Sequence, residues 1–214
     1  MLTPTPTEQT AKRLARILIQ IGAVHYFKDK PFTFTSGTVS PVYVDCRMPI
    51  SFVAEREELI DAAAEILSPL AFDYIAGGET AGIPYAAFLA ARMRKPLVYV
   101  RKRPKGFGRE AQIEGVIPKG ARTLLVEDLM FDGKSKLHFC QALRDAGSIV
   151  DHIFAVFDYG VASSQAALAE AGVKSLCLTN WNVLLQVAVE DGLFTSDQAR
   201  VVRAFLENPS GWSA

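Results

Sequence analysis

Short apolar runs alternate with segments of helical periodicity from residue 73 to residue 178. Such alternation predicts a parallel β-sheet with helices on both faces, because two parallel strands must be joined by a crossover, usually a helix. Ligands of this class of sheet bind outside the carboxyl ends of the strands, so we expect a functional site there. The expected strands are residues 74–76, 97–100, 122–126, 149–157 and 173–178, and the expected helices are residues 83–93, 133–146 and about 164–171.

The segments that flank this alternating region predict smaller additions. Residues 5–8 (Thr-Pro-Thr-Glu) have the pattern of a capping box with proline at the first helical position, which predicts a helix that Gly22 ends. Residues 24–45 predict a β-hairpin or small meander, and residues 51–67 a helix. Helices are also expected at 180–190 and 195–206, the second with a capping box of Thr195 and Gln198. We therefore expect one α/β domain over residues 1–214, with a small hood over the ligand site at about 1–50 and a helical C-terminal extension at about 180–214.

Composition narrows the class of protein. The chain has 214 residues with 23 basic and 23 acidic side chains, so its neutral net charge favours neither nucleic acid nor a membrane surface as partner. Its three cysteines are far apart and odd in number, which is typical of a reducing compartment. Charged residues in the first 20 positions argue against a signal peptide, and no apolar run approaches the ~18 residues of a membrane span. We expect a cytoplasmic protein without a protein-held metal cage, because its cysteines and histidines are scattered.

An acidic strand end followed by a helix start is the first candidate site. The apolar run 123–126 leads directly to Glu127 and Asp128, and Gly133-Lys134-Ser135 then begins an amphipathic segment. Backbone N–H groups at a helix start favour a phosphate, and ionised carboxylates accept hydrogen bonds or bind magnesium. This order predicts a sugar held by its hydroxyls at one end and by its phosphate at the other. The alternative for the two acids is a solvated loop start.

Two nucleotide-binding motifs can be excluded. The Gly-Lys-Ser segment is not a P-loop, because Asp128 occupies the place of the first glycine. Residues 77–82 (Gly-Gly-Glu-Thr-Ala-Gly) are not a dinucleotide fingerprint, because Glu79 occupies the place of the middle glycine. This second segment is either a plain tight turn or a turn whose backbone approaches an anion closely.

A basic run and a pair of aromatic segments complete the candidates. Residues 101–109 follow a strand and carry five cations, two glycines and a proline. They form a solvated loop, a nucleic-acid patch, or an active-site lid that closes over a polyphosphate. Residues 32–37 (Phe-Thr-Phe-Thr-Ser-Gly) and 40–45 (Ser-Pro-Val-Tyr-Val-Asp) form either a core edge with turns or a hood that faces a planar ligand.

Together these stretches resemble the type I phosphoribosyltransferases and, within them, the orotate phosphoribosyltransferases, over about residues 24–180. Residues 127–135 resemble the signature that binds the ribose phosphate, and residues 78–84 resemble the pyrophosphate loop. Arg101, Lys102 and Lys105 fit the flexible catalytic loop. Residues 32–37 followed by 40–45 are the most specific part, because they resemble the hood strands that distinguish orotate enzymes from purine enzymes.

The resemblance implies an enzyme of pyrimidine nucleotide biosynthesis that transfers phosphoribose from 5-phosphoribosyl 1-pyrophosphate (PRPP) to orotate, giving orotidine 5′-monophosphate and pyrophosphate. It implies Mg²⁺ as cofactor, carried by PRPP and held through Glu127 and Asp128, and a homodimer in which one subunit's loop completes the other's site. The residues then expected to be catalytic are Lys102, Lys105, Asp128 and Asp132. The residues expected to contact PRPP are Glu79, Thr80, Ala81, Arg101, Lys102, Lys105, Glu127, Asp128, Leu129, Met130, Phe131, Asp132, Gly133, Lys134 and Ser135. Those expected to contact orotate are Thr35, Tyr43, Val44, Phe131 and Tyr159.

The chain departs from the family pattern at several of these positions. Phe107 replaces a catalytic-loop histidine, and Phe131 replaces a threonine that contacts phosphate or orotate. The remaining departures are Thr35 and Ala81 in place of lysines, Tyr159 in place of an arginine, Lys134 in place of a threonine or glycine, and an unusual Met130. Two further interpretations therefore stay open: a phosphoribosyltransferase for another base, and a non-catalytic paralogue that binds the ribose phosphate and regulates a partner.

Overall fold

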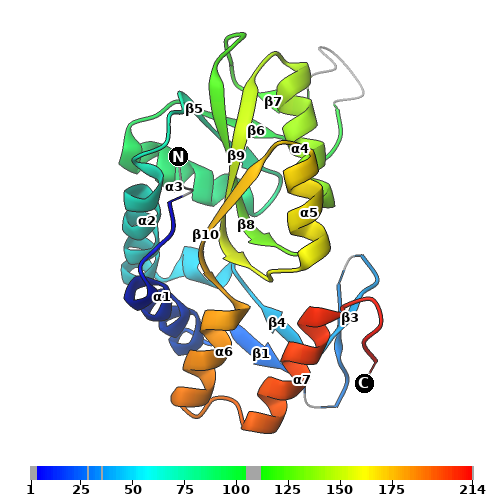
Figure 1. Cartoon of the computed structure of the whole chain (residues 1–214). Coiled ribbons are helices and arrows are strands. Elements are labelled where there is room, and N and C mark those ends of the chain that lie inside the picture. Colours follow the sequence, from blue (N-terminus) through cyan, green and yellow to red (C-terminus); the bar gives the residue numbers. More distant parts are fainter. Residues whose placement is uncertain (1–3, 28, 35, 105–111, 214) are drawn as a thin grey trace.

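A six-stranded sheet forms the centre of the molecule (Figure 1). The structure, a computed structural model, describes residues 4–27, 29–34, 36–104 and 112–213. Its strands lie in the order β10-β9-β8-β5-β6-β7, and all neighbours pair in parallel except β6 and β7, which are antiparallel. The strands are β5 (Tyr74–Gly78), β6 (Leu97–Val100), β7 (Ile113–Glu114), β8 (Arg122–Met130), β9 (Ile149–Asp158) and β10 (Lys174–Asn180).

The predicted parallel sheet is confirmed except at its edge, where β7 is antiparallel to β6, and two strands need correction. Strand β8 continues to Met130, so Glu127 and Asp128 lie inside the strand rather than after it. The cause is long-range pairing, since the ladder with β9 runs on past Glu127 to Met130. The short edge strand β7 has no counterpart among the expected strands, because two residues carry no periodicity.

Helices cover both faces of the sheet, as predicted (Figure 1). The buried side chains of β8 alternate between the faces: Leu124 packs with Tyr85 and Leu89, whereas Leu125 packs with Phe139 and Leu143. The helices on the first face are α1 (Glu8–Gln20), α2 (Val53–Leu67) and α3 (Gly82–Met93), and those on the second are α4 (Lys134–Asp145) and α5 (Ala162–Glu170).

The N-terminal hood consists of two short antiparallel pairs, β1 with β4 and β2 with β3. This arrangement agrees with the predicted hairpin or meander. A 3₁₀ turn, Met48–Ser51, connects the hood to α2. The hood strands are β1 (Val24–Tyr26), β2 (Phe32–Thr33), β3 (Val39–Ser40) and β4 (Val42–Val44).

The capping box predicted at residues 5–8 is wrong. Helix α1 begins at Glu8, and its N-cap is Thr7, whose hydroxyl accepts a hydrogen bond from Thr10 N at 3.1 Å. Thr7 has an extended backbone and accepts from the N–H group of the third helical residue, so the helix begins two residues later than a cap at Thr5 predicts.

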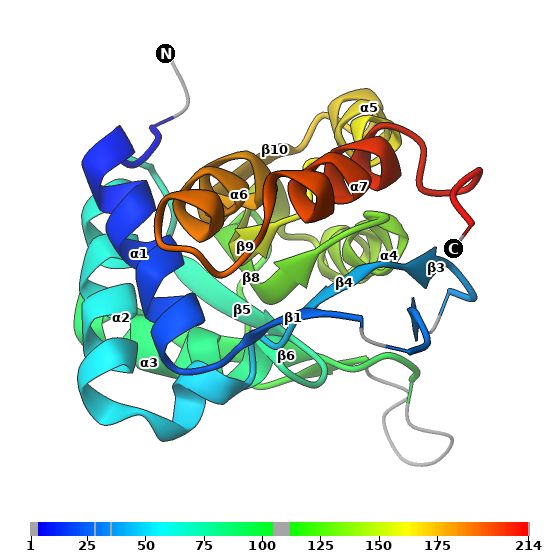
Figure 2. The same cartoon turned by 90° about the horizontal axis from the view of Figure 1, so that it is seen from below.

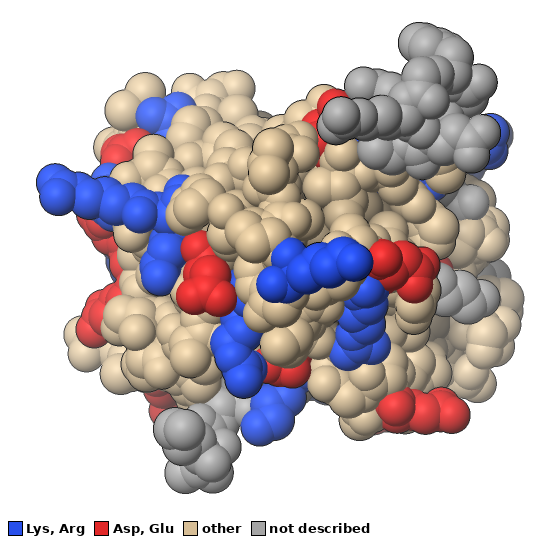
Figure 3. Space-filling view, turned by 90° about the horizontal axis from the view of Figure 1, so that it is seen from above, with Lys and Arg blue, Asp and Glu red and all other residues tan. Residues whose placement is uncertain are grey.

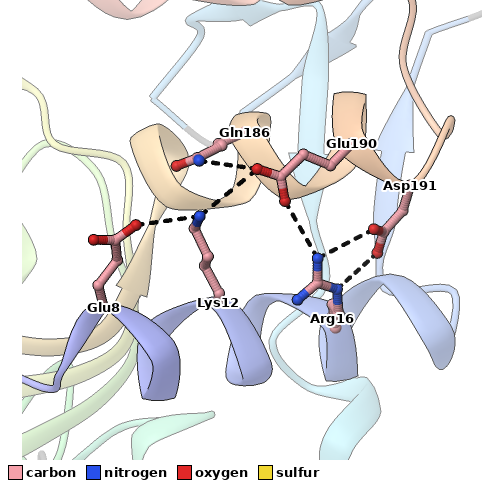
Figure 4. Close-up of polar contacts among 6 residues, drawn as sticks. All are labelled: Glu8, Lys12, Arg16, Gln186, Glu190 and Asp191. Carbon is pink, nitrogen blue, oxygen red and sulfur yellow. Dashed lines mark hydrogen bonds and ion pairs between the residues drawn. The ribbon is translucent and has the colours of Figure 1, made fainter.

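The C-terminal extension consists of α6 (Trp181–Glu190) and α7 (Ser196–Glu207). The predicted capping box of Thr195 and Gln198 is present at the start of α7. Helix α6 packs against α1, and polar contacts join them: Arg16 Nε lies 2.9 Å from Asp191 Oδ2, and Lys12 contacts Glu190 (Figure 4). In two views at right angles the C-terminal end of the chain lies beside β3, so the last residues and the hood are neighbours (Figures 1 and 2).

The surface carries charge of both signs. On the face seen in Figure 3, lysine and arginine side chains lie among aspartate and glutamate side chains. None of the helices in the described part of the chain has the length and apolar character needed to cross a membrane.

Candidate active site

A cleft of about 750 Å³ lies where the carboxyl ends of the central strands meet the hood. Its walls come from β2, β4, the turn between β5 and α3, the ends of β8 and β9, and the first turn of α4. The position agrees with the expectation for a parallel sheet. The lining residues used below are Phe34, Tyr43, Val44, Arg47, Glu79, Thr80, Ala81, Lys102, Glu127, Asp128, Leu129, Phe131, Asp132, Ser135, Lys136 and Tyr159.

Glu127 is a buried carboxylate in the floor of the cleft. The residue is 4% exposed, and its Oε2 lies 3.8 Å from Lys136 Nζ. Its Oε1 is buried and has no hydrogen-bond partner among the described residues. Burial raises the pKa of Glu127 to about 7, and the neighbouring Lys136 and Lys102 oppose that rise. A carboxylate held with an unused oxygen is ready to accept a ligand hydroxyl or a metal ion.

Asp128 lies beside it and faces a second cation. Its Oδ2 is 4.0 Å from Arg47 Nε, and the aspartate side chain is 16% exposed whereas the arginine side chain is 68% exposed. Burial raises the pKa of Asp128, against the attraction of Lys136 and Arg47. The two acids thus share one cleft but differ in access to solvent.

Three glycines let the end of β5 and the start of α3 pack closely against each other and against β8. A Cβ on Gly78 would lie 1.7 Å from Glu127 Oε1, and a Cβ on Gly82 would lie 2.5 Å from the carbonyl oxygen of Val126. A Cβ on Gly77 would lie 2.7 Å from Ile83 Cα. These glycines are therefore required by close packing around the acidic strand end. The residues between Gly78 and Gly82 are Glu79, Thr80 and Ala81, and all three line the cleft. Their role as a pyrophosphate loop stays a prediction.

Lys102 enters the cleft from the end of β6. Its backbone N–H donates to Glu79 Oε2 at 2.6 Å, which fixes the start of the basic run against the glycine-rich turn. The neighbouring Arg101 does not line the cleft; its guanidinium lies 3.5 Å from Glu114 of β7. The structure therefore brings Lys102, but not the guanidinium of Arg101, to the acids.

The start of α4 closes the opposite end of the cleft. Gly133 is its N-cap with φ of 71°, a conformation that glycine adopts without strain. Asp132 and Ser135 line the cleft, and the first N–H groups of a helix have no partner within the helix. The start of α4 is therefore the candidate anion-binding end of the site.

Aromatic rings form the remaining wall. Phe131 makes edge-to-face contacts with Phe34 and Tyr159, at centroid distances of 4.9 Å and 5.2 Å. Tyr159 is 2% exposed, and its hydroxyl accepts a hydrogen bond from Val44 N at 3.3 Å. Two residues predicted to contact orotate therefore also bond to each other, which ties the hood to the end of β9. Tyr43 lines the cleft as well.

Some predicted site residues lie away from the cleft, and others lie outside the part of the chain that the structure describes. The Met130 side chain is fully buried in the apolar core between β8 and α4, so only its backbone can face a ligand. Thr35, Lys105 and Phe107 lie outside the described residues, as does the side chain of Lys134.

Sequence reasoning missed Arg47 and Lys136, the cations beside the two acids. Lys136 directly follows the Gly-Lys-Ser segment, so the sequence alone places this lysine in the first turn of the predicted helix and could have identified it as a site residue. Arg47 follows the hood motif that ends at Asp45, but only the tertiary fold brings it to Asp128.

Comparison with known proteins gives the family. No protein-family model matches the chain. The chain is 48% identical to an orotate phosphoribosyltransferase of Agrobacterium fabrum, covering 98% of this chain and 94% of that protein. It is 47% identical to an orotate phosphoribosyltransferase of Rhizobium rhizogenes, covering 95% and 90% of the two chains.

Solved structures agree with this result. The orotate phosphoribosyltransferase of Aeropyrum pernix superposes with a TM-score of 0.73 at 30% identity, covering 85% of this chain and 99% of that chain. UMP synthase of Leishmania donovani superposes with a TM-score of 0.81 at 30% identity, covering 93% of this chain and 42% of that chain. The resemblance inferred from the motifs is therefore confirmed, and this chain belongs to the orotate phosphoribosyltransferase family.

Proposed function

We propose that the protein transfers phosphoribose from PRPP to orotate and releases pyrophosphate, as a step of pyrimidine nucleotide biosynthesis. The observation that carries this proposal is one cleft in which Glu127 and Asp128, the start of α4 and an aromatic wall face one another. The acids would hold the ribose hydroxyls, the N–H groups of residues 133–135 would bind the 5′-phosphate, and the aromatic wall would receive the base.

Magnesium fits the acidic end of the same cleft. Glu127 has a buried oxygen without a partner among the described residues, and Asp128 adds a second carboxylate close by. Carboxylate oxygens are preferred ligands of Mg²⁺, so Glu127 and Asp128 would hold the ion that PRPP carries. When bound, the ion would neutralise part of the charge of the leaving pyrophosphate.

Lys102 would stabilise the leaving group. Breaking the bond to pyrophosphate builds positive charge on the sugar and negative charge on the departing oxygen, and a positioned cation lowers the energy of that state. Lys102 is the cation of the basic run that lines the described cleft, and its backbone is bonded to Glu79. Lys105 has the same predicted role. Asp132 would order the turn before α4 or carry a proton.

Orotate would lie between the hood and the end of β8. Phe131, Tyr43 and the β4 backbone at Val44 offer a flat apolar surface and polar edges to a planar base. The homodimer and the shared catalytic loop stay predictions of the family resemblance, and the cytoplasmic location stays a prediction from the composition.

A spectrophotometric assay tests the proposal, because the ultraviolet band of orotate shifts when the base is ribosylated. We expect the shift only when PRPP and Mg²⁺ are both present, and we expect it to be lost in Asp128→Asn. Turnover of uracil or a purine with no turnover of orotate would identify a different base as the acceptor. Tight PRPP binding with no turnover of any base would identify a non-catalytic paralogue.

A further inference from the structure

An aromatic contact links the cleft to the C-terminal helix. The Phe131 ring lines the cleft on one side, and on another side it stacks nearly parallel on Phe205 of α7, with a centroid distance of 6.2 Å and an interplanar angle of 7°. Phe205 is fully buried and does not line the cleft. Helix α7 therefore contacts the cleft wall from behind, without direct access to a ligand.

The position of Phe205 is fixed by its own surroundings. Trp212 packs edge-on against Phe205 at 5.9 Å and against Phe27 of the hood at 6.3 Å. The capping box at Thr195 holds the start of α7, and Val202 is buried one turn before Phe205. These ring contacts join the hood, the C-terminal segment and α7, whose ribbons lie close together in Figure 2.

Phe131 itself has little local restraint. It lies in the bend between β8 and α4, where neither a strand ladder nor a helix holds it. Its ring is instead held by three aromatic neighbours: Phe34 and Tyr159, which also line the cleft, and Phe205. If Phe205 were smaller, the Phe131 ring could turn into the vacated space, and the base side of the cleft would lose its wall.

We propose that Phe205 of α7 is a positioning residue for the base: by holding the ring of Phe131 it sets the affinity for the acceptor base, although it does not touch that base. The proposal rests on the proposed function, because it takes Phe131 as part of the orotate wall. The sequence predicts that Phe131 contacts both substrates, but its ring packs with Phe34, Tyr159 and Phe205 on the side proposed for the base. The acids and the α4 start, which are proposed to bind PRPP, lie outside this aromatic group, so the role of Phe205 concerns the binding of the base.

Steady-state kinetics with Phe205→Leu and a matched control test the proposal. Both Phe205→Leu and Val202→Ala remove part of a fully buried apolar side chain from the same helix, but only the first removes the ring that faces Phe131. For Phe205→Leu we expect the KM for orotate to rise about threefold to tenfold, the range that an aromatic pair contributes, with the KM for PRPP unchanged. For Val202→Ala we expect both KM values to match the wild-type protein.

Two outcomes would overturn the proposal: an unchanged orotate KM in Phe205→Leu, or an equal rise of the orotate KM in Val202→Ala. If Phe205→Leu does not fold, Trp212→Leu replaces it, because it loosens Phe205 from the other side and should also raise the KM for orotate alone. An unchanged orotate KM in that variant would again contradict the positioning role.

Phe131→Leu separates this inference from the proposed function. A raised orotate KM in Phe131→Leu together with a normal one in Phe205→Leu rejects the positioning role and keeps Phe131 at the base. A normal orotate KM in Phe131→Leu places the base elsewhere, and the positioning role then fails with it.

Discussion

At the scale of single residues, the surroundings of Glu127 stabilise its charge poorly in the protein without ligand. Its carboxylate is buried, one oxygen lacks a partner among the described residues, and the nearest cation is 3.8 Å away. Its pKa is therefore raised by burial from an ordinary value of 4.5 to about 7. When this carboxyl group is ionised it lowers the free energy of unfolding, and contacts with a bound sugar or metal ion can offset that loss.

This pKa predicts how stability depends on pH. Between pH 4.5 and 7 the folded protein binds a proton at Glu127 that the unfolded chain has released, so the contribution of this residue to the free energy of unfolding falls as pH rises. The shift corresponds to about 3 kcal/mol at pH 8. Glu127→Gln is neutral at every pH, so it should match wild-type stability at pH 4.5 and exceed it by up to about 3 kcal/mol at pH 8. Urea denaturation of both proteins at the two pH values measures this, and a stability difference that does not grow with pH would contradict it.

Phe131 gives a second prediction, which follows from its three ring contacts. The family resemblance predicts threonine at this position, but here the ring packs on Phe34, Tyr159 and Phe205. Phe131→Thr would leave a cavity and place a hydroxyl against aromatic rings, so we expect lower stability by about 2–4 kcal/mol and a lower kcat/KM for orotate. Denaturation and kinetic measurements check both effects. Higher activity in Phe131→Thr would show instead that the phenylalanine is a defect.

Lys102 gives a third prediction. Its backbone N–H, rather than its side chain, makes the bond to Glu79, so truncating the side chain should leave the fold intact. For Lys102→Ala we expect a loss of about 10²–10³ in kcat with an unchanged thermal midpoint, because a cation that acts in the transition state is removed. Lys119→Ala, an exposed lysine remote from the cleft, is the control. Normal turnover in Lys102→Ala would remove the proposed role at the leaving group.

At the scale of elements, the turn between β5 and α3 and the end of β8 depend on each other. Gly78→Ala places a methyl group against Glu127 Oε1 and Phe139, so the carboxylate must move. We expect this variant to lose both stability and activity. The double variant Gly78→Ala/Glu127→Ala should be more stable than Gly78→Ala alone, because the clashing carboxylate is gone, while activity stays absent. Strictly additive stability losses, measured by denaturation, would show that the two positions are not coupled.

The sequence predicts helices and strands correctly where a local pattern determines them. It fails where pairing with a distant strand, or competition between two possible cap residues, determines where an element begins or ends. Apart from β7, the strand and helix order of residues 73–178 follows from periodicity, and the cap of α7 follows from capping chemistry. The end of β8 does not, because its last residues are strand only through their partners in β9. The first cap was misplaced by two residues because Thr5 and Thr7 compete for the same role, and only Thr7 bonds to an N–H group.

At the scale of the whole molecule, the sequence located the acids, the glycine-rich turn and the α4 start, because each is a contiguous motif at a strand end. It could not locate contacts between distant segments. Three such contacts join positions 74 to 115 residues apart in the sequence: Arg47 with Asp128, Val44 with Tyr159, and Phe205 with Phe131. Packing in the fold brings these residues together, and no local pattern indicates it.

The most direct test of the central claim is a crystal structure of the protein with PRPP and Mg²⁺. We predict the ribose hydroxyls and the metal ion at Glu127 and Asp128, the 5′-phosphate at the N–H groups that begin α4, and the pyrophosphate toward Lys102. A sugar phosphate bound away from this cleft, or bound with its phosphate at the two acids, would contradict the account.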